Sequence, residues 1–368
     1  MTDREYMALA IALAKKGEGF VNPNPMVGAV LVKDNEVIGR GYHQRFGGAH
    51  AERRALASAS ADPRGGTLYV TLEPCCHYGK TPPCTQAILE SGIRRVVVGS
   101  GDPNALVCGK GIAELRAGGA AVDTGVLEAE CDSLNKVFFH YIKHRTPYVA
   151  LKYAMTLDGK IATRSGKSQW ITGEKAREHV HRLRHRYSGI MAGIGTVLAD
   201  NPLLTCRMPG GRNPVRILCD THLRVPEDAR LVATASGVPT IIATASRDSP
   251  KIRRLTGRGC KILEVPMDTG GIRLPDLLEK LGGEGLDSIL LEGGASLAGS
   301  ALAAGVVQKV YAYISPRIFG GTGAKSPVGG TGVEAPSDAF GFTLGEVTRL
   351  GDDILLECEV AAGVYRNY

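Results

Sequence analysis

The chain has 368 residues, of which 43% are apolar and 22% charged, and its formal net charge is +7. The composition is ordinary for a globular protein, the length is natural for two domains, and the charge favours anionic partners such as phosphorylated metabolites, a dinucleotide or RNA. No run of about 18 apolar residues is present to span a bilayer, the charged N-terminal segment lacks the apolar core of a signal peptide, and nine cysteines without disulfide-framework spacing indicate a reduced, cytoplasmic protein.

The first half of the chain alternates strands with helices. Thr2-Asp3-Arg4-Glu5 is a capping box that predicts a first helix ending at Gly17. Apolar periodicity and turn residues then predict, in chain order, strands over 27–32 and 37–41, a helix from about Ala49, a strand over 67–72, a helix over 84–90, a strand over 94–98, a helix over 111–117, a strand over 120–122 and one helix over 128–143. This alternation predicts a three-layer α/β domain.

Arg145-Thr146-Pro147 is the expected boundary between two domains, 1–145 and 146–368, because one helix ends there and a new strand begins. The second half alternates again, which predicts a second α/β domain. We expect strands over 148–155, 189–192, 215–220, 240–243, 261–265 and 288–291, helices over 174–186, 275–281 and 295–304, a short helix ending at 200, and late antiparallel strands over 310–315 and 342–359.

His50-Ala51-Glu52, Glu73-Pro74-Cys75 and Pro83-Cys84 supply one imidazole, two thiols and a spare carboxylate. Catalytic zinc takes three protein ligands and leaves a fourth position open. In zinc deaminases the glutamate of His-x-Glu is not a ligand and shuttles protons while an activated water attacks an amidine carbon. We therefore predict one Zn²⁺ per chain, held by His50, Cys75 and Cys84, with Glu52 as the catalytic acid and base.

Helix geometry constrains this site. Positions i and i+2 do not share a helix face, so His50 and Glu52 can meet only if His50 lies at the helix entry. Cys75 follows Pro74, and a cysteine at a helix N-terminus has a depressed pKa that suits a thiolate ligand. The insert before Cys84 is longer than the usual spacing of this class, and a structural site with four ligands, Cys75, Cys76, His77 and Cys84, is the alternative. That alternative leaves the His-x-Glu motif unexplained.

Motifs in the second half are weaker. Gly193-Ile194-Gly195 is a lone GxG without the glycine spacing of a Rossmann fingerprint. Residues 292–296, Glu-Gly-Gly-Ala-Ser, follow an expected strand and open an expected helix, so their backbone N–H groups could hold a phosphate. A tight strand-to-helix turn explains the same residues equally well.

Together these motifs resemble one family closely, the bifunctional riboflavin-biosynthesis deaminase/reductases. In the first half the resemblance is carried by residues 22–28, Gly41-x-His43, His50-Ala51-Glu52 and residues 71–84, whose long insert is this family's own form. In the second half it is carried by Leu157-Asp158-Gly159, residues 168–172, residues 196–202 and Glu292-Gly293-Gly294. The resemblance covers nearly the whole chain. It implies an N-terminal cytidine-deaminase-like three-layer α/β/α domain and a C-terminal dihydrofolate-reductase-like α/β domain.

The resemblance implies two successive reactions. A zinc-dependent hydrolytic deamination would remove the 2-amino group of 2,5-diamino-6-ribosylamino-4(3H)-pyrimidinone 5′-phosphate and release ammonia. An NADPH-dependent reduction would then convert the ribosyl group to ribityl, giving 5-amino-6-ribitylamino-uracil 5′-phosphate. The expected partner is this small phosphorylated pyrimidine, with no nucleic acid and no membrane, and the family suggests a homo-oligomer, either dimer or tetramer.

Positions that match the family's motifs carry the implied binding roles. For the deaminase substrate they are Asn24, His43, His77 and Lys80. For NADPH they are Ala154, Trp170, Thr196, Asp200, Thr221, Gly294, Ala295, Ser296, Leu297, Ala298, Gly299 and Ser300. For the reductase substrate they are Lys152, Ser168, Arg184, Leu204, Arg207 and Glu292. Arg184 and Arg207 suit phosphate forks, whereas Trp170, the only tryptophan, could equally be a core anchor.

Two other functions fit parts of the sequence. A nucleic-acid base deaminase with a C-terminal RNA-binding domain would share the zinc chemistry, and the arginines at 177, 182, 184 and 186 could form an RNA-facing helix. RNA binding favours aromatic stacking platforms, however, and only 5% of this chain is aromatic. The third hypothesis is a zinc-stabilised scaffold without turnover.

Overall fold

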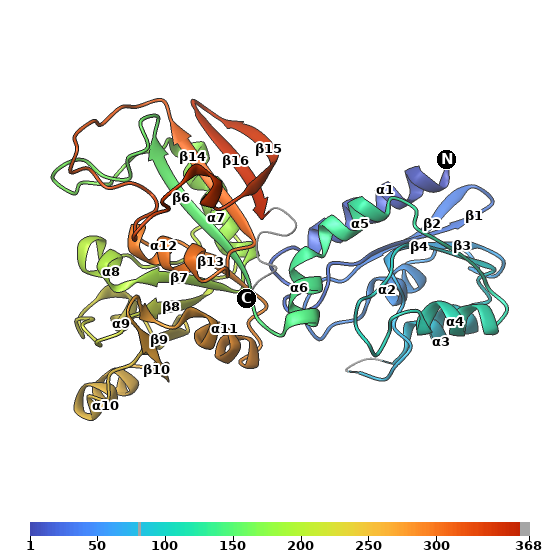
Figure 1. Ribbon diagram of the computed structural model, residues 1–368. Coiled ribbons are helices and arrows are strands. Elements are labelled where there is room, and N and C mark those ends of the chain that lie inside the picture. The colour runs from blue at the N-terminus through green and yellow to red at the C-terminus, as the bar shows by residue number, and fades with distance from the viewer. Residues whose placement is uncertain (80–81, 361–368) are drawn as a thin grey trace. The chain divides into compact units, whose positions relative to one another are not determined.

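The structure is a computed structural model that describes residues 1–79 and 82–360. The chain divides into two compact units, Met1–Arg145 and Thr146–Tyr368, each built around its own sheet (Figure 1). One predicted substrate residue, Lys80, lies outside the described residues. Within the described part of the chain, every helix is too short or too polar to cross a membrane.

The first unit is a five-stranded sheet in the order β2-β1-β3-β4-β5. Strand β1 is antiparallel to both of its neighbours, and β3, β4 and β5 are parallel to one another. The elements in chain order are α1 (Asp3–Ala14), η1 (Lys15–Gly17), β1 (Gly28–Lys33), β2 (Glu36–Tyr42), α2 (Ala51–Ala57), β3 (Thr67–Leu72), α3 (Cys84–Glu90), β4 (Arg95–Ser100), α4 (Lys110–Ala117), β5 (Ala121–Thr124), α5 (Glu128–Leu134) and α6 (Lys136–His144).

Alternate side chains of the strands separate two cores in this unit. Ala29 and Leu31 of β1 pack with helices α2, α3 and α4, whereas Val30 and Val32 pack with α1 and α5. Helices therefore cover both faces of the sheet, and the predicted three-layer arrangement is confirmed. The predicted capping box at Thr2 is also present at the start of α1.

Two glycines of β2 bring helix α2 against the sheet, backbone to backbone. A Cβ atom on Gly41 would lie 2.2 Å from the carbonyl oxygen of Ala51, and one on Gly39 would lie 2.3 Å from that of Ala55. Such distances are far inside van der Waals contact, so only glycine permits this approach. The contact fixes the start of α2, where the His-x-Glu motif lies.

One predicted helix in this unit is wrong. The helix expected over 128–143 is two helices, α5 and α6, that meet at Asn135 (φ −115°). The buried Asn135 side chain accepts a hydrogen bond from the N–H of Met26 at 2.8 Å and donates one to its carbonyl oxygen at 3.0 Å. These bonds pair the backbone N–H and carbonyl groups of Met26, which lies in a loop far away in the sequence. Burying those groups without partners would cost more free energy than interrupting the helix at Asn135.

The second unit contains a nine-stranded sheet in the order β10-β9-β8-β7-β13-β6-β14-β16-β15. Neighbours are parallel from β10 through β14, and the last two pairings are antiparallel. The elements in chain order are β6 (Tyr148–Thr156), α7 (Glu174–Arg186), β7 (Gly189–Gly193), α8 (Ile194–Asp200), β8 (Val215–Cys219), α9 (Arg230–Ala233), β9 (Thr240–Thr244), α10 (Ser249–Gly257), β10 (Cys260–Glu264), β11 (Met267–Asp268), β12 (Gly271–Ile272), α11 (Leu274–Gly283), β13 (Ser288–Leu291), α12 (Ala295–Ala303), β14 (Lys309–Ser315), η2 (Pro336–Asp338), β15 (Phe342–Leu350) and β16 (Asp353–Val360).

Helices α9 and α10 were not predicted from the sequence, and one strand pairing in this unit was predicted incorrectly. Helix α10 carried a readable signal, because the side chain of Asp248 caps it by accepting a hydrogen bond from the N–H of Lys251. The strand expected over 310–315 to be antiparallel is β14. It is antiparallel to β16 on one side but parallel to β6 on the other.

Apolar cores lie on both faces of the second sheet, one formed with α11 and α12 and the other with α8, α9 and α10. Because β6, β7, β8 and β13 run parallel, their C-terminal ends meet at one edge of the sheet. In open α/β sheets ligands bind outside this edge. The edge is therefore where a site in this unit is expected.

The close approach of α2 to β2 can be tested with Gly41→Ala. The added methyl group would overlap the carbonyl oxygen of Ala51, and overpacking of this kind typically costs about 1–3 kcal/mol. We expect a lower melting temperature by calorimetry and a lower zinc content by elemental analysis. Gly101→Ala is the matched control, because a Cβ atom there meets nothing within 4 Å. Equal effects of the two substitutions would contradict this account.

Candidate functional site

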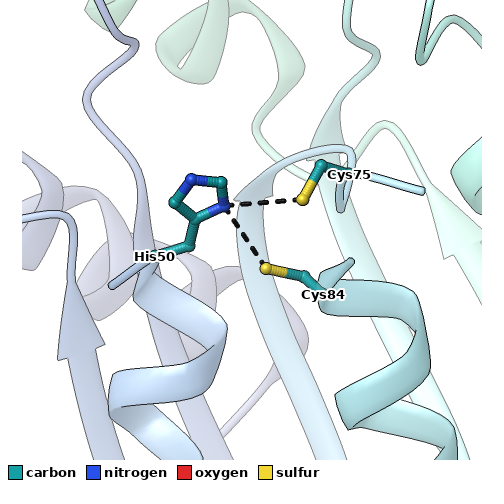
Figure 2. Close-up of side chains that lie close together, drawn as sticks. All are labelled: His50, Cys75 and Cys84. Atoms are coloured by element: carbon teal, nitrogen blue, oxygen red, sulfur yellow. Dashed lines mark hydrogen bonds between the residues drawn. The ribbon is translucent and has the colours of Figure 1, made fainter. Parts of the chain in front are cut away.

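The three predicted zinc ligands of the first unit converge on one point. His50 precedes α2, Cys75 lies in the loop after β3, and Cys84 opens α3. The Nδ1 atom of His50 lies 3.5 Å from Sγ of Cys75 and 3.4 Å from Sγ of Cys84 (Figure 2), and the three ligand atoms all lie within 4.8 Å of one another. Zinc bonds of about 2.0–2.3 Å in a tetrahedral site place ligand atoms roughly 3.5–3.8 Å apart. The residues present therefore fit zinc.

His50 occupies the helix entry, as the His-x-Glu spacing requires. Its backbone is extended (φ −71°, ψ 164°), and its carbonyl oxygen accepts a hydrogen bond from the N–H of Arg54 at 3.1 Å. Glu52 lies in the first turn of α2 and is 3% exposed. The prediction that His50 lies at the start of this helix is confirmed.

The loop between Cys75 and Cys84 is closed by backbone hydrogen bonds at its two ends. The backbone N–H groups of Cys84 and Thr85 donate to the carbonyl oxygen of Cys75 at 3.0 and 3.2 Å. The helix N-terminus belongs to Cys84, so the expectation that it supports Cys75 is wrong. Cys76 turns away and its thiol donates to the carbonyl oxygen of Leu106. Neither Cys76 nor His77 belongs to the ligand cluster, and the structural four-ligand alternative finds no support among the described residues.

Protonation at the cluster also suits a cation. Hydrogen bonds with Cys84 and with His50 hold the pKa of the Cys75 thiol well below its usual range, at about 4. The hydrogen bond with Cys75, together with burial, raises the pKa of the Cys84 thiol. Two sulfurs and a ring nitrogen thus compete for protons within one small volume. Metal binding replaces those protons.

Glu52 stands beside the cluster without belonging to it. Its Oε2 atom is buried and has no hydrogen-bond partner within residues 1–79 and 82–360. Burial raises the pKa of this carboxyl, and the nearby His50 opposes the shift. A carboxyl with a raised pKa can both accept and release a proton near neutral pH. This is the property expected of the predicted proton carrier.

A cavity of about 250 Å³ opens beside these groups. His50, Glu52 and Cys75 line it, and so do three of the four predicted substrate residues, which are Asn24, His43 and His77. Its volume is at the small end of ligand pockets, which suits a single heterocycle better than a polymer. The structure thus brings the predicted ligands, acid/base and substrate residues to one place.

His43 and Asn24 orient one another at this cavity. Nδ1 of His43 lies 3.2 Å from the carbonyl oxygen of Ala49, which can only accept, so Nδ1 carries the proton. Nε2 of His43 then accepts a hydrogen bond from Nδ2 of Asn24 at 3.2 Å. Burial lowers the pKa of His43, which favours this neutral form. The amide of Asn24 is thereby oriented with its Oδ1 atom left to meet a ligand.

The lining of the same cavity also includes four polar or aromatic residues that were not among the predicted site residues. Asp102 and Asn104 follow β4, while Phe46 and Phe138 come from a loop and from α6. Burial raises the pKa of Asp102 to about 6. A signal for the polar pair was available, because both residues lie in the loop that follows a predicted strand, and such loops typically face a ligand. The two phenylalanines had no comparable local signal.

The second unit holds a larger cavity, of about 700 Å³, at the carboxyl edge of its sheet. Most of the predicted reductase residues line it. The predicted cofactor residues in the lining are Ala154, Thr196, Asp200, Thr221, Gly294, Ala295, Ser296, Leu297 and Ser300. The predicted substrate residues in the lining are Lys152, Ser168, Arg184, Leu204 and Glu292.

Four predicted residues lie outside this lining. Ala298 and Gly299 are buried in α12, and Arg207 is exposed. Trp170 is 58% exposed, and the guanidinium of Arg177 lies 4.8 Å from its ring centroid. The alternative that Trp170 anchors the core is therefore wrong.

Glu292 is held at the cavity by two cations. Nε and Nη2 of Arg184 donate to its two carboxylate oxygens at 2.7 and 2.9 Å, and Nζ of Lys152 lies 3.5 Å from Oε2. Burial alone would raise the pKa of this carboxyl, but the two charges outweigh it and hold the pKa at about 2. Nη1 of Arg184 donates to the carbonyl oxygen of Thr205 at 3.0 Å. The guanidinium fork expected to meet a phosphate is therefore engaged by Glu292.

Comparisons with known proteins cover both units. Residues 1–100 match the family model described as the cytidine and deoxycytidylate deaminase zinc-binding region, and residues 147–356 match the RibD C-terminal domain. The chain is 52% identical over 357 residues to the riboflavin biosynthesis protein RibD of Actinobacillus pleuropneumoniae, covering 97% of this chain and 95% of the relative. It is 44% identical over 368 residues to the RibD protein of Bacillus amyloliquefaciens, covering 98% of this chain and 99% of the relative.

Solved structures match along the same length. A diaminohydroxyphosphoribosylaminopyrimidine deaminase/5-amino-6-(5-phosphoribosylamino)uracil reductase from Thermotoga maritima gives a TM-score of 0.87 at 40% identity, covering 98% of this chain and 99% of that one. RibD of Acinetobacter baumannii gives a TM-score of 0.88 at 35% identity with the same coverage. These matches confirm the predicted fold, a cytidine-deaminase-like domain followed by a dihydrofolate-reductase-like domain.

The ligand set can be tested by zinc content. Cys84→Ser should lose most of its zinc, because it removes one of only three protein ligands. Cys76→Ser is the matched control and should keep about one zinc per chain, because that sulfur is turned toward Leu106. Elemental analysis of the purified variants measures both. Equal loss from the two variants would restore the four-ligand alternative.

The clamp on Glu292 can be tested by unfolding. Arg184→Met leaves the buried carboxylate with Lys152 alone, and breaking a buried pair typically costs about 3–5 kcal/mol. The double variant Arg184→Met/Glu292→Met should recover part of that loss in denaturant titrations, because the poorly paired carboxylate is gone and only Lys152 keeps a charge. A double variant less stable than the single one would contradict this account.

The same pair has an expected pH dependence. Because the folded pKa of Glu292 is depressed to about 2, its stabilisation is complete above the ordinary carboxyl range near 4.5 and is lost as the pH falls toward 2. The difference in unfolding free energy between the wild type and Arg184→Met should therefore narrow between about pH 4.5 and 2. A difference that stays constant over that window would show that the clamp on Glu292 is not its source.

Proposed function

This chain belongs to the RibD family of riboflavin-biosynthesis proteins, and from that premise we propose that its two cavities carry out successive steps. The enzyme is a zinc-dependent deaminase fused to an NADPH-dependent reductase. We assign the deaminase to residues 1–145 and the reductase to residues 146–368. The observation that carries the proposal is the unpartnered, buried Oε2 of Glu52 beside a three-ligand cluster.

The proposed deaminase substrate is 2,5-diamino-6-ribosylamino-4(3H)-pyrimidinone 5′-phosphate. Zinc, when held by His50, Cys75 and Cys84, supplies a Lewis acid that lowers the pKa of water. Glu52 takes a proton from the attacking water and delivers it to the ring nitrogen as water adds to C2 of the pyrimidine. It then carries the remaining proton of the added hydroxyl group to the departing amino group, which leaves as ammonia while C2 becomes a carbonyl carbon.

Residues around Glu52 would orient the pyrimidine. Asn24, fixed by His43, offers its Oδ1 atom to a donor on the ring. His77 has a buried Nδ1 atom without a partner among the described residues, which supports a contact with the substrate. Lys80, outside those residues, remains the proposed cation for the 5′-phosphate. These groups orient the substrate, while Glu52 moves the protons.

In the second unit the deaminated compound would be reduced. NADPH, when bound, supplies the hydride that converts the ribosyl group to ribityl. Glu292 and Lys152 present a fixed pair of charges that can orient the opened sugar. The first turn of α12, from Ala295, presents backbone N–H groups that suit a phosphate. The product would be 5-amino-6-ribitylamino-uracil 5′-phosphate.

The nucleic-acid alternative is not favoured. Arg184 of α7 is bound to Glu292, and Arg177 stacks on Trp170 and donates to the carbonyl oxygen of Thr172. Two of the four arginines proposed to face RNA are therefore engaged within the protein. Their engagement leaves less charge for a polyanion.

We further propose that the enzyme acts in the cytoplasm as a homo-oligomer on a small phosphorylated pyrimidine, without nucleic acid. None of the nine cysteines, all of which lie in the described residues, is paired in a disulfide, which supports a reducing compartment. The oligomer is supported by the family resemblance.

Glu52→Gln should stop ammonia release and leave NADPH oxidation intact when the already deaminated compound is supplied. Glutamine keeps the shape of the side chain but cannot carry the proton, and such transfers typically contribute about 10²–10⁴-fold. The purified protein is incubated with the diaminopyrimidinone phosphate, with and without NADPH, and products are identified by mass spectrometry.

Glu292→Gln is the reciprocal control and should impair only the reduction. Loss of both activities together in a folded Glu52→Gln protein that retains its zinc would overturn the two-site assignment. A wild-type protein with zinc but no turnover of either compound would instead favour the scaffold hypothesis.

A further inference from the structure

One wall of the cavity in the first unit is a loop without helix or strand. Residues 101–109 join β4 to α4, and three of them, Asp102, Asn104 and Val107, line the cavity. Fixing the backbone of such a loop costs conformational entropy, so its side chains keep one position only where other groups hold the chain. The groups that hold this loop therefore help to decide how well the cavity binds a ligand.

The carboxylate of Glu73 accepts hydrogen bonds from both ends of this loop. Its Oε2 atom accepts one from the N–H of Gly109 at 3.0 Å and one from the N–H of Asp102 at 3.4 Å. Its Oε1 atom accepts one from the N–H of Ile112, in the first turn of α4, at 3.1 Å. Glu73 is buried, with an exposed fraction of 4%. One buried carboxylate thus ties the start of the loop to its end.

Helix α4 has no capping side chain of its own. Its N-cap residue is Gly109, with a φ of 75°, and no side-chain hydrogen bond caps the helix from that position. The first N–H groups of a helix need acceptors, and the partial positive charge at that end favours a carboxylate. Glu73, which directly follows β3, supplies both. A neutral side chain of the same size would supply less of each.

The segment that carries Glu73 also carries the zinc ligand Cys75. Between them, the carbonyl oxygen of Pro74 lies against α4, where a Cβ atom on Gly111 would be only 2.1 Å away. This backbone contact does not involve the side chain of Glu73. A change of that side chain therefore acts on loop 101–109 and leaves the approach of Pro74 to α4, next to the zinc ligand, in place.

We propose that Glu73 is a positioning residue of the deaminase, which holds loop 101–109 in the conformation that binds the substrate. The inference rests on the deaminase function proposed for this cavity. Both carboxylate oxygens of Glu73 accept from backbone N–H groups, so the residue acts through the loop and not on the reacting atoms. Without these bonds the loop is ordered for only a fraction of the time, and the apparent affinity for the substrate falls by that fraction.

The test compares Glu73→Gln with Glu130→Gln in the full-length protein. Glutamine keeps the size of the side chain but replaces one acceptor oxygen with an amide nitrogen, which donates. Glu73→Gln should raise the KM for the diaminopyrimidinone phosphate in ammonia release about 10- to 100-fold, with kcat within about threefold and about one zinc per chain. This is the reverse of Glu52→Gln, which lowers kcat. Glu130, an exposed glutamate of α5, is the matched control, and its substitution should change none of these values.

Hydrogen exchange of the ligand-free protein measures the loop without turnover. The amides of Asp102, Gly109 and Ile112 should exchange at least about tenfold faster in Glu73→Gln than in the wild type, whereas the amides of β3 should not change. Glu73→Asp keeps the charge on a side chain one carbon shorter. It should fall between the wild type and Glu73→Gln in both exchange and KM, and it carries both measurements if Glu73→Gln does not fold.

The inference is overturned if the folded variant lowers kcat with KM unchanged, if it loses zinc as Cys84→Ser does, or if exchange of the three amides stays at the wild-type rate. Loss of zinc would assign Glu73 to the support of the ligand cluster instead of the loop. Failure of the proposed deaminase function gives a different result, in which the wild type releases no ammonia. In that case the exchange measurement still decides whether Glu73 orders the loop.

Discussion

In each unit one glutamate, Glu52 or Glu292, has its side chain largely buried beside the cavity, and the way its charge is balanced decides what that residue can do. A carboxylate taken from water is costly unless a partner replaces the water. Glu292 has two cations beside it and a depressed pKa, so it stays charged and can only orient. Glu52 has an unpartnered oxygen among the described residues and a raised pKa, so it can exchange a proton. A glutamate is thereby suited to orienting a substrate for hydride transfer in one unit and to moving protons during hydrolysis in the other.

The positions of the site residues in both units are set mainly by backbone geometry. In the first unit, Gly41 allows α2 to lie against the sheet and so places His50, while Cys75 lies in the loop after β3. In the second unit, Glu292 and Thr221 follow strands whose C-terminal ends share one edge. Loops on a rigid scaffold can carry chemistry without disturbing the core. Both sites use that arrangement.

The sequence predicted most strands and helices and the three candidate zinc ligands that the fold brings together, because periodicity, capping and the His-x-Glu spacing are local signals. It failed where the decisive partner is distant. Asn135 breaks a helix in order to pair with Met26, which is 109 residues away. Arg184 resembles a phosphate fork until Glu292, 108 residues away, occupies its donors. Trp170 had no local signal that separates a core anchor from an exposed ring.

Arg184 and Arg224 show why charge alone does not identify an anion site. Both line one cavity, yet three N–H groups of Arg184 are committed to protein oxygens, whereas Arg224 has all of its donors available among the described residues. A cationic side chain can bind an anion only with the N–H donors that the fold has not already paired with protein oxygens. Within the described residues, the groups of this cavity that remain available to a phosphate are the N-terminal turn of α12 and the cations that no carboxylate has neutralised. Which cations remain unpaired is decided by the fold and cannot be predicted from the number of arginines in the sequence.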